Sequence, residues 1–304
     1  MSFKVTILGS GAALPSPKRN STAQFLECRG RRILIDCGEA TQIQLRKYKV
    51  KFQRIDIILI SHLHGDHYFG LVGLLSSMHL LGRKKSIQVY GPPELKNIIE
   101  LQLNYGGSKL AFDVEFHPLD MKKNGILYED DKIVVTHFPL AHKVATNGFL
   151  IQEKERERTL LVDKCERDNI RIEHYQFLKR GKNVIGEQGK EISFKKYTLR
   201  PDSPKSYAFC SDTKYSESIL PYIKKATVLY HEATFTQEME DRAKATMHST
   251  ARQAAKIAQL ANVGRLLIGH ISARYESGVQ HKLEAREVFE HSCVVEDGDV
   301  VEIK

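Results

Sequence analysis

The stretch SHLHGDHYFG, residues 61–70, places three histidines and an aspartate within six positions. It follows the aliphatic run 55–60 and leads into the apolar segment 68–80, which fit a strand and then a helix. The cluster is therefore expected on a loop at the carboxyl end of a strand, where ligand-binding groups commonly converge. Because zinc takes histidine nitrogens and carboxylate oxygens as ligands, the stretch predicts a metal site.

The spacing within this stretch leaves room for two ions. His62 and His64 alternate along an extended segment, so both side chains can face one cavity. Asp66 and His67 follow the turn at Gly65 and can face a second ion nearby. Two divalent ions about 3.5–4 Å apart can share a water, make it a nucleophile at neutral pH and clamp the oxygens of an in-line displacement.

Strand and helix patterns alternate along most of the chain. Strands are expected at 3–9, 31–38, 54–62, 85–92, 206–213, 226–234 and 265–275, and helices at 39–48, 92–103 and 248–264. In the last helix Ser249 or Thr250 is expected to cap the start and Gly264 to close the end. The pattern predicts a single α/β domain over 1–304, with residues 151–200 as an inserted arm.

The overall composition narrows the class of protein. The chain has 304 residues, of which 41% are hydrophobic, enough to bury a large core. Its five cysteines are scattered and never spaced C-x-x-C, which argues against a disulfide framework and a cysteine zinc site. No apolar run is long enough to span a bilayer, and the N-terminal residues lack a signal peptide. We expect a soluble cytoplasmic protein with reduced thiols.

The net charge of +9 arises from 46 Lys and Arg against 37 Asp and Glu. A basic surplus favours polyanion partners, although many soluble proteins are mildly basic without such a role. Residues 151–200 carry 13 basic and 9 acidic side chains, so this sixth of the chain contributes +4. The segment is either a solvated insertion or a mobile basic arm, and the composition fits both.

The pattern H-x-H-x-D-H at residues 62–67 resembles the metal motif of the metallo-β-lactamase superfamily. The resemblance implies a four-layer αβ/βα sandwich with two metal ions along one edge of the central sheets. It also implies a further histidine, a bridging aspartate and a final histidine, and the chain offers His142, Asp212 and His270 in that order.

The implied ligand sets divide these side chains between two zinc ions, although the residues also suit manganese. One ion is expected on His62, His64 and His142. The other is expected on Asp66, His67 and His270, with Asp212 bridging the pair.

Two further segments resemble one family within this superfamily. LYHEATF (229–235) and MHSTARQAA (247–255) are similar to the HEAT and HST motifs of ribonuclease Z, and the similarity extends from residue 7 to residue 275. The resemblance implies a homodimeric endoribonuclease that removes the 3′ trailer from precursor tRNA, leaving a 3′-hydroxyl on the tRNA and a 5′-phosphate on the trailer. It implies that His248 protonates the leaving 3′ oxygen, that Glu232 orients His248, and that Asp66 is catalytic as well as a ligand.

The resemblance also implies residues that bind the RNA. The family's loop P-x-K-x-R-N matches residues 15–20, except that Pro17 stands at the lysine position. The residues expected to contact RNA are Lys18, Arg19 and Asn20 of this loop, Arg274 after the last ligand, and Lys179, Arg180 and Lys182 of the arm.

Two other functions remain open from the sequence. A small-molecule phosphodiesterase or (thio)ester hydrolase would use the same metal ligands, but it would leave the basic arm and the HEAT and HST segments without a role. A metal-stabilised RNA-binding protein without turnover is the second alternative. A complete two-metal ligand set with a candidate acid argues against it, because structural zinc sites are normally closed and single.

Overall fold

The computed structural model describes residues 3–107, 109–186 and 189–304. The chain forms two compact units. Met1–Gln152 and Lys205–Lys304 make the larger one, here called the body, and Glu153–Pro204 make the smaller one, here called the arm. The sequence pattern placed the arm at 151–200. Residues 187 and 188 of that segment lie outside the described residues.

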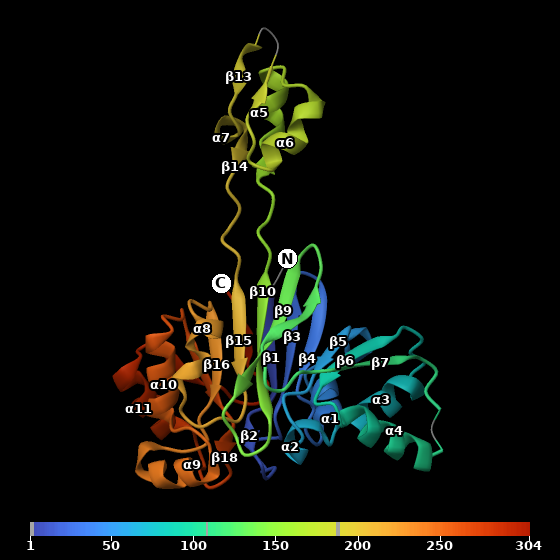
Figure 1. Cartoon of the computed structure of the whole chain (residues 1–304), viewed down its shortest axis with the longest axis vertical. Coiled ribbons are helices and arrows are strands. Elements are labelled where there is room, and N and C mark those ends of the chain that lie inside the picture. The colour runs from blue at the N-terminus through green and yellow to red at the C-terminus, as the bar shows by residue number, and fades with distance from the viewer. Residues whose placement is uncertain (1–2, 108, 187–188) are drawn as a thin grey trace. The chain divides into compact units, whose positions relative to one another are not determined.

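Two seven-stranded sheets form the centre of the body (Figure 1). The first has the order β20 (Val300–Glu302), β1 (Phe3–Gly9), β3 (Ala23–Cys28), β4 (Arg31–Ile35), β5 (Ile57–Leu59), β6 (Ile87–Gly91) and β7 (Val114–Pro118). The second has the order β19 (Ser292–Val294), β17 (Leu266–Gly269), β16 (Val228–Glu232), β15 (Ser206–Cys210), β10 (Thr146–Glu153), β9 (Ile133–Leu140) and β8 (Gly125–Glu129).

Each sheet is partly parallel and partly antiparallel. β4 to β7 run parallel, as do β15, β16, β17 and β19. Strands buried on both faces read as continuous apolar runs, which is why Ile57–Leu59 and Leu266–Gly269 contain no polar side chain. The polar side chains that follow such strands are thereby collected at one edge of each sheet.

Helices cover the outer face of each sheet (Figure 1). On the first sheet lie α1 (Thr41–Lys47), α2 (Gly65–Tyr68), α3 (Leu71–Leu80) and α4 (Leu95–Tyr105). On the second lie α8 (Leu220–Ile223), α10 (Ala251–Leu260) and α11 (Val279–Val288), with α9 (Glu240–Thr246) before α10. The core between the sheets includes Phe149, Phe209 and Tyr230, so the body is the layered helix–sheet–sheet–helix structure expected from the motif.

Helix α10 shows how the local sequence sets the start of an element. Thr250 is the N-cap, and its hydroxyl accepts from the Gln253 backbone N–H while the Gln253 side chain accepts from the Thr250 N–H. The expected end at Gly264 is wrong. The helix ends at Leu260, and Asn262 takes the left-handed backbone conformation that terminates helices.

Short elements join or flank these layers. β2 (Gly11–Ala12) pairs in parallel with β18 (Ile271–Ser272) in the body. Single turns of 3₁₀ helix lie at Phe52–Arg54, Ile172–His174, Glu217–Ile219 and Gln237–Met239. No helix among the described residues has the length and apolar character needed to cross a membrane.

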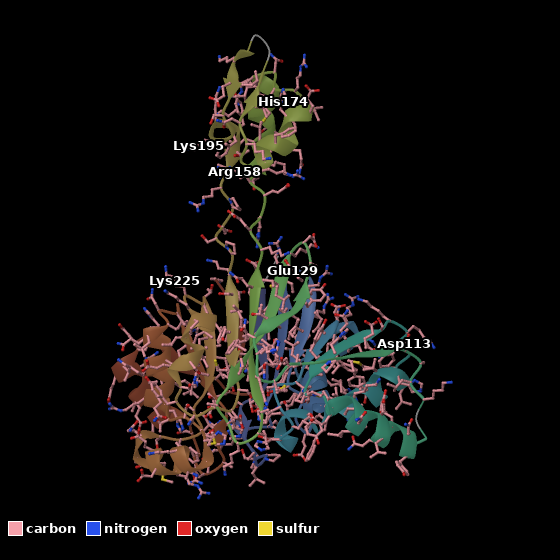
Figure 2. The ribbon with its side chains drawn as sticks, in the orientation of Figure 1. Asp113, Glu129, Arg158, His174, Lys195 and Lys225 are labelled. Atoms are coloured by element: carbon pink, nitrogen blue, oxygen red, sulfur yellow. The ribbon has the colours of Figure 1, made fainter. Side chains whose placement is uncertain are left out.

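The arm has a small core of its own around Cys165, Leu178 and Tyr197. Its elements are β11 (Thr159–Leu160), α5 (Val162–Arg167), α6 (Tyr175–Lys179), β12 (Val184–Ile185), β13 (Glu191–Ile192), α7 (Phe194–Tyr197) and β14 (Thr198–Leu199). The Arg158 guanidinium stacks over the Phe194 ring at 4.9 Å, and Figure 2 labels Arg158 among the charged side chains of the arm.

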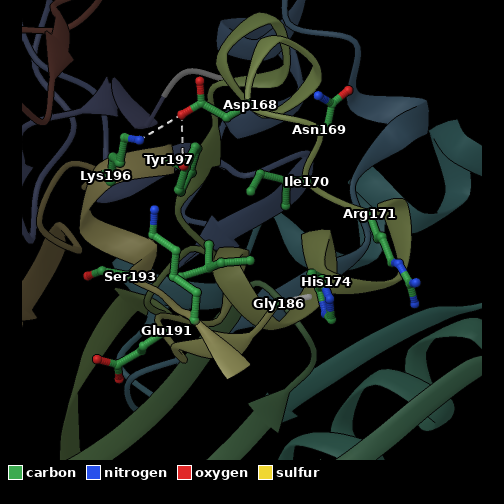
Figure 3. A pocket seen from close by; sticks show the side chains of 12 residues that line it. Asp168, Asn169, Ile170, Arg171, His174, Gly186, Glu191, Ser193, Lys196 and Tyr197 are labelled. Atoms are coloured by element: carbon green, nitrogen blue, oxygen red, sulfur yellow. Dashed lines mark hydrogen bonds and ion pairs between the residues drawn. The ribbon is translucent and has the colours of Figure 1, made fainter. Parts of the chain in front are cut away.

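A pocket of about 580 Å³ lies within the arm (Figure 3). The Lys196 ammonium and the Tyr197 hydroxyl both donate to Asp168, at 2.7 and 2.8 Å. Arg171, Lys190 and His174 line the pocket together with Asp168 and Glu191. Three basic side chains, Arg171, Lys190 and Lys196, therefore line the pocket with two acidic ones, so their charges largely cancel.

Candidate metal centre

Gly38 and Gly70 allow the loop 61–70 to pack closely against the residues that follow β4. The Gly70 N–H donates to the Cys37 carbonyl at 2.9 Å, and the Cys37 N–H donates to the His67 carbonyl at 2.7 Å. A Cβ at Gly70 would lie 2.1 Å from the Gly38 carbonyl oxygen, and one at Gly38 would lie 2.3 Å from that of Asp66. Only glycine permits such close backbone approach. The loop therefore holds its histidines at a fixed place beside the strand end.

The seven expected ligand side chains lie together. Ligand atoms of His62, His64, His142 and Asp212 lie within 4.8 Å of one another, and so do those of Asp66, His67 and His270. In the chain these residues follow the ends of β5, β9, β15 and β17. The structure thus brings together side chains from four separated parts of the sequence.

Asp212 lies between the two groups. Its Oδ2 is 3.7 Å from both His62 Nε2 and His142 Nε2. Its Oδ1 is 3.3 Å from His67 Nε2 and 3.1 Å from His270 Nε2. One carboxylate oxygen therefore faces each group, as a bridging ligand requires.

The donor atoms of the cluster fit divalent cations. Nε2 of His62, His67, His142 and His270 and Oδ1 of Asp212 are buried and have no hydrogen-bond partner among the described residues. Buried polar atoms in folded proteins are almost always paired, and five unpaired ones converge here. Neutral imidazoles and carboxylates are the donor set that zinc takes. The residues present therefore fit a pair of metal ions.

A second layer of residues fixes the direction of four of the five histidine rings. His67 Nδ1 lies 2.7 Å from Asp36 Oδ2, and His62 Nδ1 lies 3.0 Å from Ser61 Oγ. Ser61 also donates its N–H and its hydroxyl to Asp36, at 2.8 and 2.9 Å. Holding Nδ1 in this way directs Nε2 into the cluster.

Two more histidine rings are held by residues that follow α9 and β16. His142 Nδ1 donates to the Met247 carbonyl at 2.9 Å, and His270 Nδ1 lies 3.0 Å from Thr234 Oγ1. His270 also has a positive φ of 58°, which costs energy for a residue other than glycine and is typical of functional sites. Sequence reasoning missed Asp36, Ser61 and Thr234 as supporting residues. For Asp36 a signal exists, because it directly follows the apolar strand β4.

His248 lies at the edge of the cluster and is paired with Glu232. The distance from His248 Nδ1 to Glu232 Oε1 is 2.8 Å, and the His248 ring centroid is 5.0 Å from that of His142. Glu232 is fully buried and accepts backbone N–H groups from Thr213, Thr234 and Ser249. This carboxylate is therefore held in place by the backbone.

The pair also sets the charge on the imidazole. Burial opposes protonation of His248, but the charge and hydrogen bond of Glu232 outweigh it and raise the pKa of His248 to about 9. The pKa of Glu232 is lowered, because His248 overcomes the effect of its burial. The arrangement presents a protonated imidazole, which is a proton donor, to the cluster.

A pocket of about 510 Å³ opens over the cluster. Lys143, Arg242 and Arg274 line it alongside residues of the cluster. The Arg274 guanidinium lies over the Phe235 ring at 5.2 Å and donates to Ser272 Oγ at 3.1 Å. In the described parts of the chain, neither Lys143 nor Arg242 forms an ion pair. The pocket therefore offers positive charge to an anionic substrate.

Arg19 and Asn20 of the expected RNA-binding loop make contacts within the protein. Arg19 is only 4% exposed, and its guanidinium donates to Glu296 at 2.8 Å and to the Tyr275 carbonyl at 3.2 Å. The Asn20 amide donates to Asp297 at 2.8 Å. Both side chains are thus paired inside the protein, and their contact with RNA stays a prediction. Lys18 is exposed, and its ammonium donates to the Glu276 carbonyl at 3.3 Å.

The expected RNA-binding residues of the arm lie near the end of α6. Lys179 and Arg180 both pair with Glu157, at 3.1 and 3.3 Å. Lys182 is exposed and forms no ion pair within the described ranges. The arm therefore has basic side chains on its surface, and two of them form ion pairs with the same carboxylate.

Comparison with known proteins gives one match to the first half of the chain and others to nearly its whole length. Residues 3–164 match the family model described as anti-Pycsar protein Apyc1. This match includes the first four ligands and His142, and it ends before Asp212. The chain is 40% identical to a ribonuclease Z of Parabacteroides distasonis over 296 residues, which is 97% of each chain.

Solved structures give the same picture. The human short-form tRNase Z superimposes with a TM-score of 0.73 and 28% identity, covering 99% of both chains. The metallo-β-lactamase fold protein YhfI of Bacillus subtilis gives a TM-score of 0.69 at 19% identity, covering 99% of this chain and all of that one (100%). The expected metallo-β-lactamase fold is thereby confirmed.

Proposed function

The chain belongs to the ribonuclease Z family, the endonucleases of tRNA 3′ processing, and from that premise we propose how it removes the 3′ trailer of precursor tRNA. The observation that carries the proposal is the cluster of seven side chains in two groups that share Asp212. The same side chains would also serve a small-molecule phosphodiesterase or (thio)ester hydrolase, which is the second candidate.

The ligand groups would hold two divalent ions, for which zinc is proposed. One ion would be held by His62, His64 and His142. The other would be held by Asp66, His67 and His270, and Asp212 would bind both ions. Such ions supply a nucleophilic water at neutral pH and neutralise charge on the phosphate. The protein's own contribution is to orient the rings through Asp36, Ser61, Thr234 and the Met247 carbonyl.

Three side chains are assigned to orienting the nucleophile and protonating the leaving group. Asp66 accepts a hydrogen bond from the Ala13 N–H at 2.9 Å, lies in the wall of the pocket and would accept a hydrogen bond from the attacking water. His248 gives its proton to the departing 3′ oxygen, and Glu232 keeps His248 charged and oriented. The P–O3′ bond breaks, so the tRNA keeps a 3′-hydroxyl and the trailer keeps the 5′-phosphate.

Positive groups at two places support an RNA substrate. Lys143, Arg242 and Arg274 line the pocket over the cluster and suit the phosphates on either side of the scissile bond. The basic side chains of the arm, including Lys182, would contact phosphates of the tRNA away from the scissile bond. Both contributions depend on salt, because neutralising phosphates releases counterions.

A homodimer is proposed from the family resemblance. Ile43 of α1 and Leu80 and Leu81 at the end of α3 are 60%, 80% and 64% exposed, and they support a second copy of the chain as the occupant of this surface. Sedimentation measurements on the wild type and on Leu80→Glu test the proposal. Loss of the dimer in Leu80→Glu is expected, and a monomeric wild type would contradict it.

Cleavage of two substrates tests the proposed function. Wild-type protein is assayed on a precursor tRNA, with both product ends mapped, and on bis-p-nitrophenyl phosphate, each with and without a chelator. We expect a single cut at the trailer junction that leaves a 3′-hydroxyl and is abolished by chelation. Turnover of the small phosphodiester without any cut in precursor tRNA would overturn the proposal in favour of the second candidate.

A further inference from the structure

One carboxylate near the C-terminal end of the chain ties together both ends of the loop 10–20. Asp297 Oδ1 accepts from the Ser10 N–H at 2.9 Å and from the Ser10 hydroxyl at 2.7 Å. Its Oδ2 accepts from the Asn20 N–H and the Asn20 side-chain amide, both at 2.8 Å. Ser10 is completely buried. All four hydrogen bonds of this carboxylate therefore go to the residues where the loop leaves and rejoins the sheet.

The neighbouring residue holds the loop at a second point. Glu296 accepts from the buried Arg19 guanidinium at 2.8 Å, and the Tyr275 carbonyl accepts from it at 3.2 Å. The loop is closed internally as well, because the Ser16 N–H donates to the Arg19 carbonyl at 2.9 Å. The turn that carries Glu296 and Asp297 is itself fixed by the Gly298 N–H, which donates to the Ile7 carbonyl at 2.8 Å.

The inner side of the same loop reaches the metal ligands. The Ala13 N–H donates to Asp66 Oδ2 at 2.9 Å. Strand β2 of the loop pairs with β18, which directly follows His270, and the Ile271 N–H donates to the Ser10 carbonyl at 3.0 Å. Displacement of the loop would therefore disturb two ligands, one through its carboxylate and one through its backbone.

We propose that Asp297 is a positioning residue that holds the loop 10–20 against the metal cluster, so that the Ala13 amide orients Asp66. Arg19 and Asn20 are the anchors of this loop on Glu296 and Asp297, and they do not contact the RNA. Only the catalytic consequence of this anchoring rests on the proposed function. The anchoring itself is a property of the chain and is testable without substrate.

Hydrogen–deuterium exchange of the loop tests the anchoring directly. In Asp297→Ala all four bonds are lost, so we expect the amides of the 10–20 peptide to exchange roughly tenfold faster, with the α10 peptide unchanged. Asp297→Asn should be intermediate, because its carbonyl still accepts two bonds and the Ser10 hydroxyl can accept from its amide. Asp299→Asn is the matched control, since it changes the same charge in the same turn and Asp299 accepts one local bond, from the Glu296 N–H.

Salt dependence separates an anchor from an RNA contact. For Arg19→Gln we expect kcat on precursor tRNA to fall while the slope of log(kcat/KM) against log salt stays unchanged. A side chain that binds phosphate would instead lower this slope by about one when removed, and Arg274→Gln provides that comparison.

Two results would overturn the proposal. One is hydrogen–deuterium exchange of the loop in Asp297→Ala at the same rate as in the wild type. The other is a smaller slope of log(kcat/KM) against log salt in Arg19→Gln with an unchanged kcat. If wild-type protein does not cut precursor tRNA, the proposed function fails, but the exchange measurement still decides the anchoring.

Discussion

Protonation of His248 depends on one neighbour. Glu232 is buried and its oxygens are occupied by backbone N–H groups, so its charge acts on the imidazole from a fixed position. A proton donor matters most when the leaving oxygen is basic, as the 3′ oxygen of RNA is. It matters little for p-nitrophenolate, which departs without protonation.

The first prediction follows from this difference between leaving groups. His248→Ala should lower kcat on precursor tRNA by roughly 10²- to 10⁴-fold, and its effect on bis-p-nitrophenyl phosphate should be much smaller. Steady-state kinetics on both substrates measure the two losses. His291→Ala, which removes an exposed histidine of the body, is the control. Equal losses on both substrates would contradict the role of His248 as an acid.

The second prediction concerns pH. Glu232 raises the pKa of His248 to about 9 against the opposing effect of burial, so the acid form is present below that pKa and is lost as the pH rises through it. In Glu232→Gln the pKa of His248 falls, and the alkaline limb of the kcat profile should move to lower pH. Glu238→Gln removes an acid from the neighbouring turn Gln237–Met239 and should leave the limb in place. An unmoved limb in Glu232→Gln would show that another group titrates there.

At the residue scale the sequence predicted which side chains cluster, but it did not predict the residues that orient them. The spacing of His62, His64, Asp66 and His67 is visible in a single stretch, and the resemblance supplied the remaining ligands. For Arg19 the motif gave the residue type but not the direction of its side chain. That direction is set by Glu296, 277 positions away in the chain.

At the scale of elements, helix α10 connects the stability of the fold with the site. It begins at Ala251, two residues after the backbone N–H of Ser249 donates to Glu232. The capping box at Thr250 fixes this start and satisfies N–H groups that the first turn leaves without partners. Damage to the cap should therefore be measurable as a loss of stability.

The third prediction is made on this cap. Thr250→Ala should lower the free energy of unfolding by about 1 kcal/mol, because the hydroxyl that accepts from the Gln253 N–H is removed. Urea denaturation followed by circular dichroism gives the value. Ser218→Ala, at an exposed hydroxyl, should change it by less than about 0.5 kcal/mol. A Thr250→Ala variant as stable as wild type would show that the cap is unimportant.

Elements were predictable where local signals were strong. Apolar runs marked most strands, and the polar residues at 248–250 marked the start of α10. The end of that helix was mispredicted because Asn262 terminates it before Gly264. Gly264 serves packing instead, since a Cβ there would lie 2.7 Å from the Thr227 carbonyl oxygen.

At the scale of the whole molecule, the sequence indicated an α/β chain but not the order of its strands. β1 pairs with β20, so Lys4 lies opposite Glu302 although nearly the whole chain separates them in sequence. Pairing over such distances depends on packing between the sheets and leaves no local pattern. The arm was visible as a change of composition, whereas its internal core around Cys165, Leu178 and Tyr197 was not.

The fourth prediction concerns the arm. Replacing residues 155–195 with a short Gly–Ser linker should raise KM for precursor tRNA and flatten its salt dependence, because basic contacts to the RNA are lost. Turnover of bis-p-nitrophenyl phosphate should persist, since every proposed ligand lies in the body. Thermal unfolding of the variant serves as the folding control. Unchanged kinetics on precursor tRNA would mean that the arm does not bind the substrate.

Titration of metal-free protein with zinc, followed by cleavage of precursor tRNA, tests the central claim most directly. Seven side chains in two groups joined by Asp212 predict that activity is absent without metal and reaches its maximum at two equivalents per chain. Cleavage that persists in the metal-free protein, or a maximum at one equivalent, would contradict the two-ion site.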